Sequence, residues 1–339
     1  MNPTRRALVA TLLAGVLAPV AARSASRPPY TTRDDVQRFI DDVVRQHGFD
    51  RDRVERWLGA ARYSETVERL MQPPIPFGQR NWLDYRARYL EDRRIQAGAT
   101  FWRSNSAALE RAQARYGVPP EIVVAIIGVE TFFGRITGNF RTIDALATLS
   151  FDYLRRADYY RNELVELLLL AREQRMDPTA FKGSFAGAIG LPQFMPGSVR
   201  RFAVDFDADG RIDLTSSAAD AIGSVANFLV EHGWQREQAI LFATEADEQI
   251  VDTLGRGINV GPTWSDALTA GITTDLPLAL DTPVIVIDLP YVDSNGETRR
   301  LYRVGTVNFS AVLHYNRSYF YATAVVELAE ALRREVAPS

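Results

Sequence analysis

The 339-residue sequence has no cysteine, a single lysine and three histidines. The lack of cysteine excludes disulfides, a catalytic thiol and thiolate metal sites. His47, His232 and His314 do not form the H-E-x-x-H spacing of a zinc hydrolase, and no G-x-S-x-G segment of a serine hydrolase is present. The formal net charge of −3 argues against a basic surface for nucleic acid. The fold must therefore be held together by its apolar core and by any metal ion that it binds.

The first 26 residues, MNPTRRALVATLLAGVLAPVAARSAS, differ in composition from the rest. Arg5 and Arg6 precede an apolar run from Ala7 to Ala22, and small residues follow it. The run is short for a membrane span, and this order of segments is typical of a secretory signal peptide. The arginine pair fits twin-arginine export, and an uncleaved anchor is the alternative. The lack of cysteine also rules out a lipid-modified N-terminal cysteine, so we expect an exported protein whose mature form has no lipid anchor and no membrane span.

The remaining sequence predicts a mainly α-helical protein of the α+β class. Apolar residues recur at helical spacing over 31–72, in one long stretch over 82–117 and from 120 to about 175. Further helices are expected over 217–234 and 318–336. Strand-forming residues alternate over 277–305 around the turn residues Asn295 and Gly296. We therefore expect one small β unit in an otherwise helical chain.

The segment EIVVAIIGVETFFGRITG, residues 121–138, places a single carboxylate at the end of an apolar run. Burial disfavours a charged carboxylate, so we expect the pKa of Glu130 to be raised and its side chain to be protonated near neutral pH. A protonated glutamate that faces a cleft suits general acid catalysis. The alternatives are a glutamate exposed to water at a helix end, or one paired with Arg135.

A glycine-rich stretch, FKGSFAGAIGLPQFMPGS, occupies residues 181–198. Its glycines allow the backbone to approach a ligand or another segment closely. Ser184, Gln193, Phe194 and Met195 combine polar groups with flat or soft apolar side chains, as a sugar-binding cleft requires. The stretch lacks the glycine–lysine–serine/threonine ending of a phosphate-binding loop. It is either part of a binding cleft or a tightly packed loop in the core.

An acidic loop, DFDADGRIDL, follows at residues 205–214. Its aspartates have the D-x-D-x-D-G order of a calcium loop, which usually ends in a bidentate glutamate at the twelfth position. Ser216 stands at that position, so the remaining carboxylate would have to come from Asp220. The predicted ligand set for a structural Ca²⁺ is Asp205, Asp207, Asp209, Arg211 at the seventh position, and Asp220. The alternative is an acidic turn that caps the next helix.

Five segments carry a resemblance to a known family: GVETFFGRITG, DALATLSFDYLRRADYYRNEL, KGSFAGAIGLPQFMPGSVRRFAVDFDADG, DAIGSVANFLVEHGW and HYNRSYFYATAV. In this order they resemble the membrane-bound lytic transglycosylase B family, glycoside hydrolase family 103. The resemblance extends from about residue 30 to the end. It implies a lysozyme-like core, an added helical domain and a small β insertion.

The resemblance also implies a division into domains. A helical domain would span 30–115 and include the C-terminal helix 317–336. The lysozyme-like core would span 116–240, with the acidic loop at 205–220. A small β domain would cover 245–308, and residues 309–321 would line the cleft.

The activity implied by the resemblance is cleavage of the β-1,4 bond between N-acetylmuramic acid and N-acetylglucosamine in peptidoglycan, with formation of a 1,6-anhydro ring. Glu130 matches the family's catalytic glutamate, and no cofactor is expected for catalysis. The peptidoglycan strand is the expected partner, and a monomer is the expected form. The residues that match the family's substrate-binding positions are Ser184, Gln193, Phe194, Met195, Tyr315, Asn316, Tyr321, Arg155 and Arg156.

Some positions depart from the family pattern. Leu191 and Pro192 replace a common tyrosine–glycine pair, and Phe228 replaces a tyrosine. Two other functions stay open on the sequence. One is a hydrolytic muramidase, which needs a second carboxylate such as Asp144 or Asp152. The other is a peptidoglycan-binding protein without activity.

Overall fold

The computed structural model describes residues 27–72, 81–272 and 276–336. The segment predicted to be a signal peptide, 1–26, lies outside these ranges. In the described part, no helix has the length and apolar character needed to cross a membrane.

The described chain is mostly helical, as the sequence predicted. The helices are α1 Asp34–His47, α2 Arg51–Ala60, α3 Glu65–Leu70, α4 Trp82–Ala87, α5 Asp92–Ser104, α6 Ser106–Tyr116, α7 Pro120–Thr131, α8 Thr142–Phe151, α9 Ala157–Glu173, α10 Pro196–Phe202, α11 Ala218–Glu231, α12 Glu248–Leu254, α13 Trp264–Thr269, α14 Val307–Tyr315 and α15 Tyr319–Val336. The strands are β1 Phe140–Arg141, β2 Lys182–Gly183, β3 Leu241–Thr244, β4 Ile285–Val292 and β5 Thr298–Gly305.

Helix α7 forms the centre of the largest apolar core. It starts with Pro120 at its first position, where the missing N–H costs nothing. The residues from Ile122 to Gly128 are all buried, which explains why the sequence shows a continuous apolar run rather than an amphipathic stripe. Helices α15, α5, α6 and α11 pack around it. The C-terminal helix α15 therefore supports the helix that carries Glu130.

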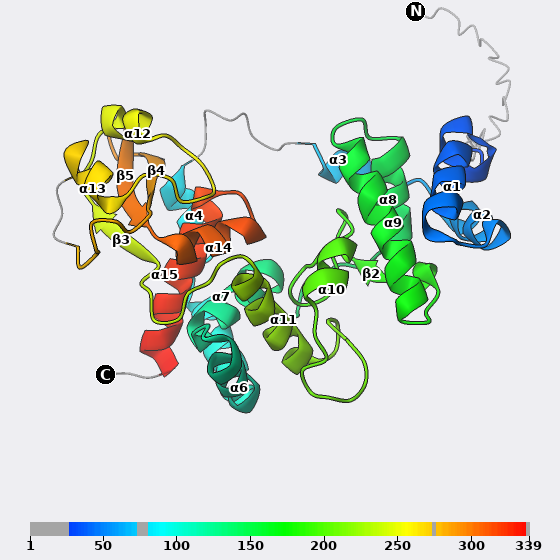
Figure 1. Ribbon diagram of the computed structural model, residues 1–339, viewed down its shortest axis with the longest axis horizontal. Coiled ribbons are helices and arrows are strands. Elements are labelled where there is room, and N and C mark those ends of the chain that lie inside the picture. The colour runs from blue at the N-terminus through cyan, green and yellow to red at the C-terminus, as the bar shows by residue number, and fades with distance from the viewer. Residues whose placement is uncertain (1–26, 73–80, 273–275, 337–339) are drawn as a thin grey trace, which may run out of the picture.

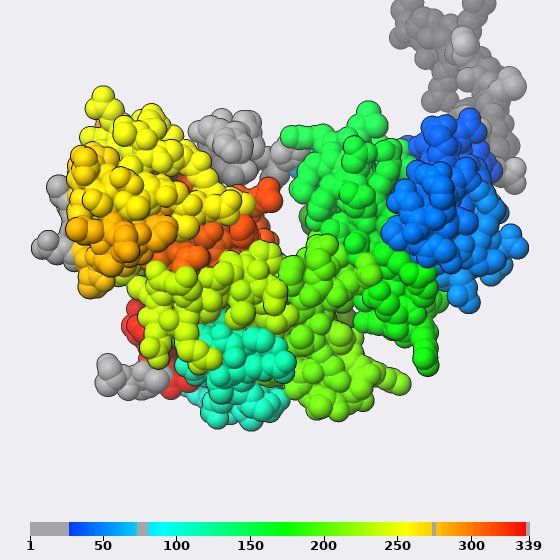
Figure 2. All heavy atoms as spheres, viewed as in Figure 1, coloured from blue at the N-terminus to red at the C-terminus, as the bar shows by residue number. Residues whose placement is uncertain are grey.

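Helices α8 and α9 form a second packed group, and α1 and α2 lie beside it at one end of the molecule (Figure 1). Helix α15 lies on the other side, next to the sheet. The space-filling view is hollowed between the green region of α8 and the orange-red region of α14 (Figure 2). Helix α10 and the loops around it connect the two sides below this hollow (Figure 1).

The small sheet has the order β3-β5-β4, with both pairs antiparallel. Strands β4 and β5 form the hairpin that the sequence predicted, and Gly296 takes the positive φ of 82° that its turn requires. Strand β3 precedes the expected unit, and helices α12 and α13 were not predicted. These elements enclose a separate apolar cluster built around Val251, Trp264 and Val304.

The long helix expected over 82–117 is divided into α4, α5 and α6. The first break covers residues 88–91. Glu91, the N-cap residue of α5, has an extended backbone conformation. The second lies at Asn105, whose side-chain amide and backbone N–H both donate to the carbonyl oxygen of Phe101, at 2.8 and 3.1 Å. Neither break contains proline or glycine, so the helical periodicity of the sequence conceals both.

Candidate active site

Glu130 is the penultimate residue of α7 and is partly buried. Its carboxyl oxygen Oε1 accepts a 2.7 Å hydrogen bond from the hydroxyl of Tyr321 in α15. Burial raises the pKa of Glu130 to about 7, and the hydrogen bond from Tyr321 partly opposes this shift. Among the described residues, no neighbouring charge contributes to the shift. Glu130 is therefore divided between its protonated and ionised forms near neutral pH.

The end of α7 is held in an unusual backbone conformation. Phe132 and Phe133 both have positive φ, 51° and 60°, which is costly for residues with a Cβ. The Phe133 ring lies so close to Gly98 of α5 and Gly128 of α7 that a side chain at either glycine would overlap it. Arg94 donates from Nη1 to the carbonyl oxygen of Gly128 at 2.6 Å and caps the helix end. These contacts fix the position of Glu130.

The alternative considered for Glu130, a pairing with Arg135, does not occur among the described residues. Arg135 is exposed, and its guanidinium lies 5.2 Å from the ring centre of Phe132. The carboxyl group of Glu130 therefore has a phenol, rather than a cation, as its polar neighbour.

Tyr315 and Tyr321 flank the turn between α14 and α15 and lie face to face, with ring centres 6.4 Å apart and an interplanar angle of 14°. The Tyr315 hydroxyl donates to the carbonyl oxygen of Pro192 at 2.6 Å, so it joins the C-terminal segment to the glycine-rich loop. Burial and the charge of Glu130 raise the pKa of both phenols, which stay protonated and able to donate.

The glycine-rich loop approaches other backbone closely at Gly183, as the sequence suggested. A Cβ there would overlap the carbonyl oxygen of Ala188. Ser184 accepts at its Oγ from the Ala188 amide at 3.1 Å, and within the described ranges its hydroxyl has no acceptor. Gln193 has a positive φ of 52°, and its amide nitrogen donates to the carbonyl oxygens of Thr137 and Gly190. Only its amide oxygen remains for a ligand.

Phe194 and Met195 come next in this loop. Phe194 is buried, with its ring centre 5.7 Å from that of Tyr315 and 5.5 Å from that of Phe228. The Phe228 ring itself lies 4.8 Å from Tyr315. Phe228, which lacks the hydroxyl usual in the family, thus packs together with Phe194 against the ring of Tyr315. Met195 is partly buried and immediately precedes α10.

The remaining predicted substrate contacts lie on exposed turns. Asn316 is exposed in extended backbone just after α14. Arg155 and Arg156 are exposed between α8 and α9. Arg156 has a positive φ of 60°, and its guanidinium lies 4.3 Å from the ring centre of Tyr159. The sequence placed these three residues in the site only through the family resemblance.

Tyr85 of α4 is a neighbour of Glu130 that the sequence did not reveal. Its ring centre lies 5.5 Å from that of Phe320, the residue before Tyr321. Burial, then the phenol of Tyr89, and also the charge of Glu130 raise the pKa of Tyr85. A tyrosine in an amphipathic stretch is usually a packing residue, and no local pattern distinguishes this one.

The two carboxylates considered for hydrolysis are engaged elsewhere. The Asp144 carboxylate accepts from the backbone N–H of Arg62 at 3.0 Å and lies 3.4 Å from Nη1 of Arg141. Asp152 accepts from the hydroxyl of Tyr30 and the guanidinium of Arg33. Neither contributes to the pKa of Glu130. Their partners belong to the N-terminal segments or to β1, not to the surroundings of Glu130.

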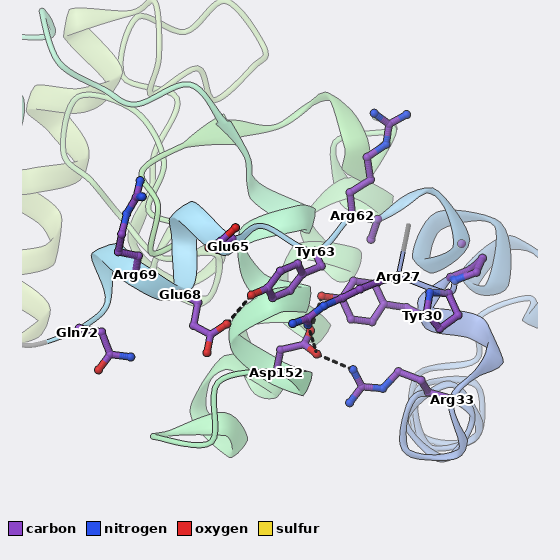
Figure 3. A pocket seen from close by; sticks show the side chains of 14 residues that line it. Arg27, Tyr30, Arg33, Arg62, Tyr63, Glu65, Glu68, Arg69, Gln72 and Asp152 are labelled. Atoms are coloured by element: carbon purple, nitrogen blue, oxygen red, sulfur yellow. Dashed lines mark hydrogen bonds and ion pairs between the residues drawn. The ribbon is translucent and has the colours of Figure 1, made fainter. Parts of the chain in front are cut away.

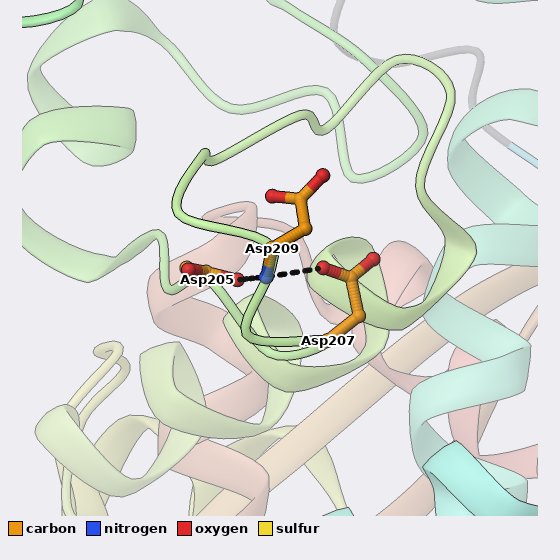
Figure 4. Close-up of side chains that lie close together, drawn as sticks. All are labelled: Asp205, Asp207 and Asp209. Carbon is orange, nitrogen blue, oxygen red and sulfur yellow. Dashed lines mark hydrogen bonds between the residues drawn. The ribbon is translucent and has the colours of Figure 1, made fainter.

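The acidic loop brings together carboxylate oxygens of Asp205, Asp207 and Asp209, all within 4.8 Å of one another (Figure 4). The backbone N–H of Asp209 points between the carboxylates of Asp205 and Asp207, at 3.2 and 3.3 Å. Three oxygen donors in this arrangement fit a hard cation such as Ca²⁺. The carbonyl of Arg211 follows in the loop.

Asp220 does not join that cluster. It is buried, and its two oxygens accept from the backbone N–H groups of Phe206 at 2.7 Å and Asp213 at 2.8 Å. It therefore holds the two ends of the loop together. Asp213, at the ninth position, caps the turn by accepting from Thr215 and Ser216.

Residues 31–330 match the family model described as the transglycosylase SLT domain. The chain is 42% identical over 311 residues to the membrane-bound lytic murein transglycosylase B of Escherichia coli (strain K12), covering 89% of this chain and 84% of that protein. The structure of the E. coli lytic transglycosylase Slt35 in complex with calcium matches with 40% identity and a TM-score of 0.79, over 91% of this chain and 95% of that one.

A more distant solved structure is SltB3 from Pseudomonas aeruginosa in complex with NAG-NAM-pentapeptide. It shares 27% identity, with a TM-score of 0.73, over 88% of this chain and 79% of that one. The fold and the sequence similarity over most of the chain agree. The chain belongs to the SLT-domain transglycosylase family and is a lytic murein transglycosylase.

Proposed function

We propose that Glu130 is the sole general acid and base of this enzyme, and that it cleaves the bond between N-acetylmuramic acid and N-acetylglucosamine with formation of a 1,6-anhydro ring. The observation that carries this proposal is a single carboxyl group with a pKa of about 7, bound to Tyr321 and without a second carboxylate among its described contacts. A hydrolase of either stereochemistry normally needs two carboxylates across the bond.

In the first step, the protonated Glu130 donates its proton to the glycosidic oxygen as the C1–O bond breaks. In the second step, the carboxylate takes the proton from the sugar's own 6-hydroxyl, whose oxygen attacks C1. Because the nucleophile is part of the substrate, it is already close to the reacting carbon. A pKa near 7 suits both steps, since neither form of Glu130 is strongly favoured at neutral pH.

Tyr321 and Tyr315 would orient this chemistry. The Tyr321 hydroxyl fixes the carboxyl group of Glu130. The Tyr315 hydroxyl attaches the end of α14 to the glycine-rich loop through the carbonyl oxygen of Pro192. Ser184, Gln193, Phe194 and Met195 would contact the sugars from that loop, and Asn316 would do so from the α14–α15 turn. Arg155 and Arg156 would lie near the sugar that carries the peptide. We also propose that residues 116–240 form the lysozyme-like core, that residues 245–308 form a small β domain, and that residues 309–321 line the cleft.

Product analysis tests the proposed reaction. We expect purified peptidoglycan digested by the mature protein to yield muropeptides with 1,6-anhydro ends, which mass spectrometry distinguishes from reducing ends by the mass of one water. Reducing ends would instead indicate a hydrolytic muramidase. No product at all would indicate a binding protein.

We also propose that the protein acts in the periplasm, where its substrate lies. The basic and apolar pattern of residues 1–26 supports export.

We propose in addition that Asp205, Asp207 and Asp209 hold a structural Ca²⁺, with the carbonyl of Arg211, and that Asp220 closes the loop around them. The calcium complex of the E. coli relative supports this assignment.

Calcium should stabilise the protein, because an ion that binds only the folded loop removes the repulsion among three carboxylates. When bound ions have first been removed with a chelator, we expect added millimolar Ca²⁺ to raise the melting temperature of the protein by at least about 2 °C. Asp207→Asn should abolish that rise, whereas Asp281→Asn, at an exposed aspartate outside the loop, should retain it. An equal rise in both variants would contradict the site.

A further inference from the structure

A pocket with a volume of about 1130 Å³ lies away from Glu130. It opens between the N-terminal segment, the α2–α3 connection with α3, and the end of α8 (Figure 3). None of the side chains that contact Glu130 lines it. The proposed reaction leaves this pocket without a role.

The floor of the pocket is a fixed polar network around Asp152. Its carboxylate accepts from the hydroxyl of Tyr30 at 2.6 Å, from Nη1 of Arg33 at 2.8 Å and from Nη1 of Arg27 at 3.3 Å. The Arg27 guanidinium lies 3.5 Å from the ring centre of Tyr63. Since these groups satisfy one another, the floor is preorganised and needs no ligand to balance its charge.

The rim is different, because its charges are not paired within the described chain. The guanidinium groups of Arg62 and Arg69 and the carboxylate of Glu65 have no ion pair or side-chain hydrogen bond there. Figure 3 shows the three side chains along the same stretch of chain, on the side away from Asp152. Glu68 also lines the pocket, and its carboxylate accepts from the Tyr63 hydroxyl at 2.6 Å. The pocket thus presents the cations of Arg62 and Arg69 beside the carboxylates of Glu65 and Glu68, a mixture that complements a ligand with both carboxylates and a free amine.

The pocket is next to the predicted position of the peptide-bearing sugar. Asp152 lies in its floor, and Arg155 and Arg156 follow within four residues, a distance of at most about 14 Å along the chain. The Tyr153 hydroxyl donates to the carbonyl oxygen of Met71 at 3.1 Å, so the loop after α8 is attached to the end of α3. A peptide leaving a sugar held at Arg155 would meet the rim.

We infer that this pocket binds the peptide stem of the murein strand, with Arg62 and Arg69 on its carboxylates and Glu65 on the amine of its diamino acid. The inference rests on the proposed function of the Glu130 site, because it takes the strand held there as the source of the peptide. It makes these residues determinants of specificity that act outside the reaction centre.

The test compares murein strands that carry stems with the same strands after an amidase has removed them. The wild-type protein should release anhydro ends with a higher kcat/KM from strands that carry stems than from stripped strands. The double variant R62Q/R69Q should lose at least about tenfold in kcat/KM on strands with stems and keep the wild-type value on stripped strands. Arg38→Gln is the matched control, because Arg38 is an exposed arginine of α1 outside the pocket.

An equal loss of the double variant on both substrates, or no loss on either, would overturn the inference. If stripped strands are not cleaved at all, calorimetric titration with the free stem tetrapeptide decides. Binding to the wild type but not to R62Q/R69Q supports the pocket, and equal or absent binding rejects it. Failure of the proposed reaction itself would be distinct, since the wild type would then release no anhydro ends from either substrate.

Discussion

Glu130→Gln is expected to abolish the formation of anhydro ends, with a loss of at least about 10³-fold in rate. The amide can still accept the hydrogen bond from Tyr321, so the local structure should persist. It can neither donate a proton to the leaving oxygen nor accept one from the 6-hydroxyl. Because the same group is needed in both steps, no neighbouring residue should compensate. The measurement is mass spectrometry of the digested murein over a time course.

The same substitution should stabilise the protein at alkaline pH. The pKa of Glu130 is about 7 in the folded protein against an ordinary value of 4.5. Between these values the unfolded chain binds fewer protons than the folded one, so stability falls as pH rises through this window. Above pH 7 the cost is about 3 kcal/mol. Glu130→Gln should therefore raise the melting temperature at pH 8 by several degrees and change it little at pH 4.5.

Tyr321→Phe is the informative companion variant. It keeps the carboxyl group but removes the hydrogen bond that lowers the pKa of Glu130. The pKa should therefore rise, and the alkaline decline of kcat/KM should move to higher pH. If Glu130→Gln retained activity, or if its melting temperature matched the wild type at both pH values, Glu130 would not be a buried general acid.

The sequence predicted a carboxyl group with a raised pKa at Glu130 but not the contact that holds it. An apolar run ending in one carboxylate indicates burial, and α7 is buried along nearly its whole length. The partner hydroxyl of Tyr321 comes from 191 residues further along the chain. Such a contact has no local signature, and the family resemblance placed Tyr321 only among the residues that line the cleft. The same is true of Tyr315, whose hydrogen bond to Pro192 spans 123 residues.

Other features were concealed by local pattern. The stretch over 82–117 has continuous helical periodicity, so the turns that place Tyr85 and Arg94 at the end of α7 could not be predicted. The pocket around Asp152 combines side chains from the N-terminal segment, α3 and the end of α8. In the sequence these charges resemble ordinary solvated surface, and only the fold brings them together.

Gly183→Ala is expected to damage stability and activity together. A Cβ at this position would overlap the carbonyl oxygen of Ala188 and lie 2.9 Å from its carbonyl carbon. These are backbone atoms, so they cannot rotate away as a side chain would. Gly138, with a φ of 89°, also lies close to the backbone of Gly183, since a Cβ there would overlap the Gly183 carbonyl oxygen. We expect a loss of about 1–3 kcal/mol in the free energy of unfolding.

Activity should fall further than stability suggests, because Ser184 follows directly and its backbone N–H donates to the same carbonyl oxygen of Ala188 at 2.9 Å. A displacement of Ser184 by about 1 Å should reduce kcat/KM by up to about 100-fold. Gly261→Ala is the matched control, since a Cβ there meets no atom within 4 Å and Gly261 does not line the pocket around Asp152. Urea unfolding and anhydro-end release should separate the two variants. Wild-type activity in Gly183→Ala would show that the glycine-rich loop serves packing alone and does not position the sugar.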